Sequence, residues 1–215
     1  GLVDDGAGGV VRRASAALDF ELEVGFVVGV GSSGEPIAPD DADRHVFGAV
    51  LVNDWSARDI QAFEYQPLGP FLGKSFATTV GAWVAPLAAL APFLVEAPAQ
   101  DPLPDPALRA ARPWGLDLTL AVELEGCEIT RTSFAHQWWT FAQQLAHLTS
   151  NGSTTRTGDL LASGTVSGPD RRREAGSLIE ATWRGAEPID LGDGRSRTFL
   201  ADGDTVVLRG WAGDG

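Results

Sequence analysis

Three acidic residues, Glu21, Glu23 and Asp54, have the chemistry to bind a hard divalent cation. One residue separates the two glutamates, and Asp54 opens a polar stretch that includes Arg58. Carboxylate oxygens are the ligands that Mg²⁺ and Ca²⁺ prefer. A cation beside an arginine, an amide and a lysine can also stabilise an oxyanion. This combination suits hydrolysis at a carbonyl group better than it suits a structural role.

The glutamate pair is also compatible with an ordinary solvent-facing strand. Residues 18–30 alternate between apolar and other side chains, which predicts a strand with Glu21 and Glu23 on one face and Asp19 beside them. The flanking residues are very apolar, and like charges in a buried setting repel each other unless a cation neutralises them. This setting favours the metal site. The chain has no cluster of histidines and cysteines, which argues against zinc.

Composition excludes several classes of partner. The net charge of −13 argues against nucleic acid and against an anionic membrane surface. No apolar run approaches the roughly 20 residues of a membrane span, and no leader opens the chain. Cys127 is the only cysteine, so no intrachain disulfide can form. We therefore expect a cytoplasmic protein with no nucleic-acid or membrane partner.

The pattern predicts one domain over residues 1–215, mostly β with a few helices, as a mixed β-sandwich or β-roll. Residues 1–17 and the proline-rich residues 91–114 are predicted to be loops. Residues 56–65 are predicted to form a short helix, capped by Ser56 or Asp54, with Arg58 and Gln61 on one face. Residues 137–148 are predicted to form a longer helix, with Trp138 and Trp139 in the core. Further strands are predicted at 46–52, 78–90, 116–124, 159–167, 177–183 and 205–211.

Other residues leave two interpretations open. Gly69 and the later Gly73-Lys74 pair are one residue too close for a phosphate-binding loop, so Lys74 is either exposed or directed into the site. Arg58 could form a surface ion pair with Asp59, which would leave Gln61 and Tyr65 as ordinary surface residues. Glu180 lies within an apolar segment that we predict to be a strand, and both a functional and a structural role fit it.

Several long segments resemble the fumarylacetoacetate hydrolase family, over about residues 15–215. The resemblance is carried by Asp19-Phe20-Glu21-Leu22-Glu23, by residues 52–61 (VNDWSARDIQ), by residues 64–75 (EYQPLGPFLGKS), by residues 158–165 (GDLLASGT) and by residues 188–194 (PIDLGDG). It implies the catalytic, C-terminal type of domain. It also implies a homodimeric enzyme that uses Mg²⁺ or Ca²⁺ to cleave a carbon–carbon bond of a diketo acid. Fumarylacetoacetate would give fumarate and acetoacetate, the last step of tyrosine and phenylalanine breakdown.

The resemblance also implies a role for individual residues. Glu21, Glu23 and Asp54 match metal-binding carboxylates, with Lys74 and Thr78 in the same metal region. Arg58, Gln61 and Lys74 match groups that face the developing negative charge. Substrate contacts are implied for Gln61, Tyr65 and Thr165. Glu180 matches the carboxylate that orients a catalytic histidine.

One departure from the family pattern is serious. In the family, the catalytic histidine, a fourth metal carboxylate and a substrate tyrosine precede the Glu-x-Glu strand, whereas residues 1–20 contain no histidine and no tyrosine. We therefore expect a fragment that lacks the N-terminal domain, the histidine segment and the extreme C-terminus. Such a fragment would keep the metal half-site but show little or no turnover.

Three alternatives remain open from the sequence. An acylpyruvate hydrolase or a related decarboxylase would use the same carboxylate set. A calcium-dependent β-sandwich could bind a ligand through its seven tryptophans without catalysis. A purely structural domain would have no metal site at all.

Overall fold

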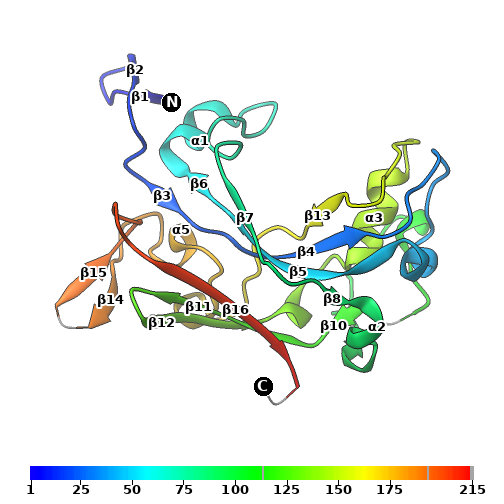
Figure 1. Ribbon diagram of the computed structural model, residues 1–215. Helices are drawn as coiled ribbons and strands as arrows, with labels where there is room; N and C mark the ends of the chain where they lie inside the picture. Colours follow the sequence, from blue (N-terminus) through cyan, green and yellow to red (C-terminus); the bar gives the residue numbers. More distant parts are fainter. Residues whose placement is uncertain (113, 193, 214–215) are drawn as a thin grey trace.

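Two antiparallel sheets contribute to one hydrophobic core in the computed structural model, which describes residues 1–112, 114–192 and 194–213 (Figure 1). The larger sheet has the strand order β13-β4-β5-β7, and β8 also pairs with β5; the smaller sheet has the order β12-β11-β16. The bounds are β4 Leu22–Val28, β5 Val46–Asp54, β7 Thr78–Val80, β8 Ala85–Pro86, β11 Leu118–Leu124, β12 Cys127–Ser133, β13 Leu160–Ala162 and β16 Val206–Ala212. The prediction of a mostly β fold with a few helices is confirmed.

Short strand pairs and helices surround these sheets. The pairs are β1 Leu2–Asp4 with β2 Val10–Arg12, β3 Leu18–Asp19 with β6 Ser56–Ala57, β9 Leu94–Val95 with β10 Gly115–Leu116, and β14 Ile189–Gly192 with β15 Arg195–Arg197. The helices are α1 Arg58–Glu64, α2 Leu87–Leu90, α3 Phe141–Thr149, α4 Arg171–Glu174 and α5 Leu178–Ala181. Single 3₁₀ turns are η1 Pro39–Arg44, η2 Ala91–Phe93, η3 Pro106–Leu108 and η4 Phe134–His136. None of the described helices is long and apolar enough to cross a bilayer.

The core lies where α3 packs against the larger sheet. The ring of Phe26 in β4 stacks on that of Phe141 in α3, with 4.6 Å between centroids. Trp114 meets the same Phe141 ring edge-on at 5.3 Å. Nearly every residue of β4 is buried, because this strand lies between β13 and β5 and is covered on both faces. A polar side chain in β4 is therefore held in a fixed, poorly solvated position.

Several predicted boundaries were wrong. Residues 1–17 are not a plain loop: β1 and β2 form a hairpin, and Val3 buries its side chain against Ile60 of α1. Within the predicted loop 91–114, η2, β9 and η3 form short ordered pieces. The strand predicted at 177–183 is the helix α5 instead.

The two predicted helices begin later than expected. α3 starts at Phe141, since Thr140 caps it in a reciprocal capping box with Gln143. Trp138 and Trp139 therefore precede the helix, and they are 38% and 42% exposed, so their predicted core placement is wrong. α1 is preceded by Ala57 with no side-chain cap, because the Ser56 hydroxyl donates to the Asp54 carbonyl instead.

Candidate active site

The three predicted carboxylates converge in the structure. β4 pairs with β5 so that Leu22 lies opposite Asn53 and Glu23 opposite Val52, which brings Glu21 and Glu23 beside Asp54. The Asn53 amide oxygen also accepts the Glu21 N–H at 3.1 Å. One oxygen from each carboxylate lies within 4.8 Å of the others. The sequence prediction that these three side chains share one place is therefore confirmed.

The pKa values of Glu23 and Glu21 are shifted in opposite directions. Burial, together with the negative charges of Glu21 and Asp54, raises the pKa of Glu23 to about 7. The Gly164 N–H donates to Glu23 at 3.1 Å and partly offsets that rise. Burial would also raise the pKa of Glu21, but hydrogen bonds and charge from Lys74 and Arg58 lower it overall. The cluster thus holds more negative charge than its cationic side chains compensate.

Two cationic side chains, Arg58 and Lys74, contact the carboxylates. The Lys74 side chain is 16% exposed. Its ammonium forms ion pairs with both Glu21 and Asp54, and the distance to the Asp54 carboxylate is 3.2 Å. Arg58, at the start of α1, donates through Nη1 to Glu21 at 2.7 Å and to the Gln61 amide oxygen at 3.1 Å. Its Nη2 is buried without a hydrogen-bond partner among the described residues. The alternative of a surface pair between Arg58 and Asp59 is wrong, because Asp59 pairs with Arg13.

Asp19 is a buried carboxylate beside the site, which the sequence analysis placed on the strand face of Glu21 and Glu23 without assigning it a role. It is fully buried and accepts hydrogen bonds from Arg58 Nε at 2.8 Å and from the N–H groups of Leu178 and Ile179 at 2.7 and 3.0 Å. Burial raises the pKa of Asp19, while Arg58 and these N–H donors oppose the rise. The available signal was a third acidic residue on one strand face, which needs a cation such as Arg58.

The remaining predicted site residues are Gln61, Tyr65, Thr78 and Thr165. Gln61 stands one helical turn from Arg58 and contacts it, while Tyr65 follows α1 with its side chain 46% exposed. Thr78 pairs with Asp54 across β5 and β7. Thr165 follows Gly164, the residue that donates to Glu23. Among the described residues, no side-chain hydrogen bond joins Tyr65, Thr78 or Thr165 to the three carboxylates.

Glu180 is placed differently from the prediction. It lies in α5 rather than in a strand, and its carboxylate accepts the hydroxyls of Ser167 and Ser177 at 2.7 and 3.0 Å. The N-terminus of α5 is held by Asp19, so Glu180 and Arg58 are both fixed relative to one buried carboxylate. No histidine donates to Glu180 in the part of the chain that the structure describes.

Comparison with known proteins identifies the family. The model for the fumarylacetoacetate (FAA) hydrolase C-terminal domain matches residues 2–213. The fumarylacetoacetases of Rattus norvegicus and Homo sapiens are each 52% identical to this chain over 213 residues. The chain belongs to the fumarylacetoacetate hydrolase family. The match covers 95% of this chain and 51% of each relative, so the chain spans about half the length of these curated relatives.

Solved structures agree with the family's fold. The fumarylacetoacetate hydrolase of Exiguobacterium antarcticum aligns with a TM-score of 0.60 at 22% identity, over 91% of this chain and 53% of that one. A 5-carboxymethyl-2-hydroxymuconate delta-isomerase from Mycobacterium smegmatis aligns with a TM-score of 0.56 at 20% identity, over 91% and 55%. At these identities the likeness establishes the fumarylacetoacetate hydrolase fold alone.

The carboxylates of this family member fit a hard divalent cation. Three oxygen donors converge, and the pKa of Glu23 is raised by burial and by the two negative charges that face it. A divalent cation would remove that repulsion, whereas the single positive charge of Lys74 offsets it only in part. Glu21, Glu23 and Asp54 would hold the ion. The ligand set is all oxygen, which suits Mg²⁺ or Ca²⁺.

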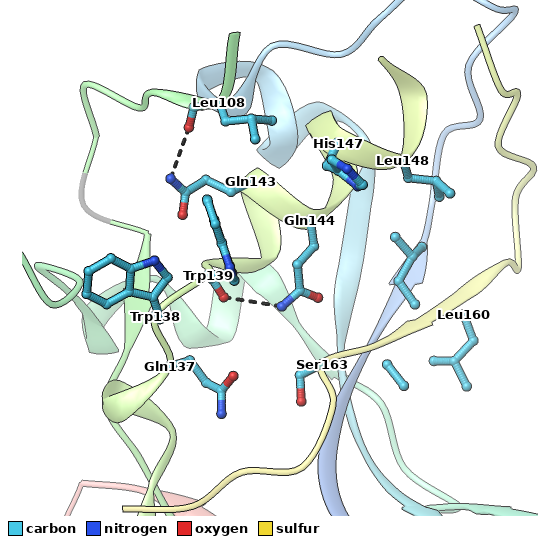
Figure 2. Close-up of a pocket in the computed structure, with 12 residues that line it drawn as sticks. Leu108, Gln137, Trp138, Trp139, Gln143, Gln144, His147, Leu148, Leu160 and Ser163 are labelled. Atoms are coloured by element: carbon cyan, nitrogen blue, oxygen red, sulfur yellow. Dashed lines mark hydrogen bonds between the residues drawn. The ribbon is translucent and has the colours of Figure 1, made fainter. Parts of the chain in front are cut away.

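A separate hollow of about 730 Å³ is lined in part by residues 160–163 (Figure 2). The close-up shows Trp138, Trp139 and His147 facing it from the α3 side, with Leu160 and Ser163 opposite. None of the three carboxylates lines this hollow, although Ser163 directly precedes the residue that donates to Glu23. The hollow explains why the two tryptophans are exposed, and it contributes no titratable acid to the site.

Proposed function

We propose that this chain carries the carboxylate half of a hydrolytic site that cleaves fumarylacetoacetate to fumarate and acetoacetate. The observation that carries the proposal is the convergence of Glu21, Glu23 and Asp54 beside Lys74 and Arg58. Similarity to fumarylacetoacetases over nearly the whole chain supports the choice of substrate. The site is proposed to take a small-molecule diketo acid.

In the proposed reaction, water adds to the carbonyl carbon on the fumaryl side, and the adjacent carbon–carbon bond breaks. Its electron pair goes to the acetoacetate carbon, which then takes a proton. Lys74, Arg58 and the amide of Gln61 face the oxygen that becomes negative, and they favour that charge electrostatically. Removing one such donor commonly lowers kcat by about 10²–10³.

A divalent cation, when bound by Glu21, Glu23 and Asp54, would act as a Lewis acid that polarises the substrate's oxygens. Thr78 lies opposite Asp54 in the sheet, and we assign it to the same metal region. We assign Tyr65 and Thr165 to substrate contact, because they lie at the ends of segments that also carry Gln61 and Gly164. Mg²⁺ and Ca²⁺ are the proposed ions.

Water also needs a group that accepts its proton, and Glu180 is proposed to orient that group. In the described residues Glu180 contacts two serines and no histidine. We therefore expect the 215-residue chain alone to turn over slowly, and added imidazole to raise the rate by acting as the missing base.

The experiment measures fumarate and acetoacetate by NMR, with Mg²⁺ or Ca²⁺ present, across a series of imidazole concentrations. The proposal predicts equal amounts of the two products and an imidazole effect that Glu180→Gln and Lys74→Gln both remove. Glu35→Gln, which changes an exposed turn residue, serves as the matched control. Absence of both products above the Glu23→Gln background at every imidazole concentration would contradict the proposal. Acylpyruvate in place of fumarylacetoacetate tests the related hydrolase activity in the same assay.

We also propose that the protein acts as a cytoplasmic homodimer, as the family resemblance implies. Light scattering would then give about twice the chain's 22.6 kDa at micromolar concentration. A mass equal to one chain over the whole concentration range would exclude the dimer for this chain.

A further inference from the structure

The segment 65–75 connects two residues assigned to the proposed site. It leaves α1 at Tyr65 and returns to the carboxylates at Lys74, whose ammonium bridges Glu21 and Asp54. No regular strand or helix spans the residues between them. The position of the Lys74 ammonium therefore depends on what holds this segment in place.

Glu64, the last residue of α1, closes the segment. One of its carboxylate oxygens accepts the N–H groups of Phe71 and Gly73 at 2.8 and 2.7 Å. Burial alone would raise the pKa of Glu64, but the N–H donors of Gly73 and Phe71 outweigh burial and lower it. The carboxylate is therefore ionised at neutral pH, and charge-assisted hydrogen bonds of this kind are stronger than neutral ones.

Gly73 then fixes the segment against α1. Its carbonyl accepts the Ala57 N–H at 2.8 Å, just before the helix begins. A Cβ atom at Gly73 would lie 2.8 Å from the Gln61 N atom and 3.0 Å from its Cα, which leaves no room for a side chain. The backbone of the residue before Lys74 is thus pressed onto the helix that carries Arg58 and Gln61.

We propose that Glu64 is a positioning residue, whose carboxylate holds the 65–75 segment closed and thereby places the Lys74 ammonium between Glu21 and Asp54. Glu64 touches none of the three carboxylates among the described contacts, so it acts through the backbone of Phe71 and Gly73. The link to catalysis rests on the proposed function of Lys74, whereas the placement of the ammonium does not.

The sequence offers a direct probe of this placement, because Lys74 is the only lysine among the 215 residues. Trace labelling with dinitrofluorobenzene, followed by mass spectrometry of the peptide that contains Lys74, reports how freely its amine reacts. An ammonium held by two carboxylates reacts slowly. Glu64→Gln should raise the labelling rate on the order of tenfold, because it removes a charge-assisted acceptor of two N–H groups.

Two further variants make the test decisive. Gly73→Ala should raise the same rate, because it displaces the segment from α1 while leaving Glu64 in place. Glu35→Gln, an exposed glutamate elsewhere, should leave the rate unchanged. Labelling is carried out below the onset of thermal unfolding for each variant, so a general loss of stability does not register.

A Lys74 labelling rate in Glu64→Gln within twofold of the wild-type rate would overturn the proposal. If Glu64→Gln does not fold, Glu64→Asp is used instead, because it keeps the charge but is too short to reach both N–H groups. An unchanged Lys74 labelling rate in Glu64→Asp would also overturn the proposal. Labelling needs neither substrate nor metal. The Glu64 proposal can therefore fail while the fumarate assay succeeds, and it can hold while the fumarate assay fails. In the imidazole-supported assay, Glu64→Gln should lower kcat more than it raises KM.

Discussion

At the scale of single residues, Glu23 makes the stability of the metal-free protein depend on pH. Its pKa is 4.5 for the free side chain and about 7 in the fold. Between these values the folded state retains a proton that the unfolded chain has lost, so stability falls as pH rises through that window. The difference corresponds to about 3 kcal/mol. Urea unfolding in EDTA at pH 5 and pH 8 should show this loss.

The variant Glu23→Gln and the addition of a divalent cation both test whether Glu23 causes that pH dependence. Glu23→Gln cannot ionise, so its change in unfolding free energy between pH 5 and pH 8 should be smaller than that of the wild type by most of this amount. Saturating Mg²⁺ or Ca²⁺ should likewise flatten the wild-type profile, since metal binding favours the ionised carboxylate. Equal slopes for wild type and Glu23→Gln would show that another group causes the loss.

The residue types alone were enough to find part of the site. Glu21, Glu23 and Asp54 could be predicted because hard-ligand chemistry and strand alternation both restrict their positions. Asp19 and Glu64 could not be assigned roles, because the backbone N–H groups that they accept lie 159 and 9 residues away in the sequence. The other partner of Asp19, the Arg58 side chain, lies 39 residues away. Backbone donors carry no residue-type signal, so a carboxylate that binds them resembles an ordinary surface acid.

At the scale of elements, Asp19 joins β3, α1 and α5. It is fully buried, and it pairs with Arg58 of α1 and with the first N–H groups of α5. Asp19→Asn would leave the Arg58 guanidinium buried without its counter-charge. We expect a loss of about 3–5 kcal/mol in unfolding free energy, the cost typical of breaking a buried ion pair. Urea denaturation measures this loss.

A surface ion pair provides the comparison for Asp19. Glu128→Gln removes the exposed contact with Arg131, and such pairs contribute about 0–1 kcal/mol. If Asp19→Asn cost no more than Glu128→Gln, then Asp19 would not be the residue that joins these three elements. The exchange of α5 amides is a second readout, and it should accelerate in Asp19→Asn alone.

Element types were predicted well only where the periodic pattern was long. The alternating residues 116–124 were predicted to be one strand, and β11 covers Leu118–Leu124 of them, while Leu116 belongs to β10. Residues 177–183 contain a short apolar run, which fits a buried strand and a buried helical turn equally. Tertiary contacts decided in favour of α5, since Asp19 satisfies the N–H groups at its start. Local sequence could not reveal that partner.

At the scale of the whole molecule, the site exists only when distant parts of the chain have come together. β4 supplies Glu23, the end of β5 supplies Asp54, and the segment after α1 supplies Lys74, while Gly164 reaches the cluster from beyond β13. Trp138 and Trp139 were predicted to lie in the core, and both are exposed. Their apolar character predicts burial, whereas the capping of α3 at Thr140 places them beside the open hollow instead.

Since only the folded chain assembles these ligands, a divalent cation should stabilise the whole protein by binding the native state. At 100 times its dissociation constant, an ion would add about 2.7 kcal/mol of stability. The molecule's net charge of −13 means that any salt also relieves general repulsion. Thermal unfolding should therefore be compared in MgCl₂ or CaCl₂ and in NaCl of equal ionic strength. We expect a higher midpoint with the divalent salt for the wild type and equal midpoints for Asp54→Asn. A matching gain in Asp54→Asn would assign the effect to screening and remove the carboxylate cluster as the binding site.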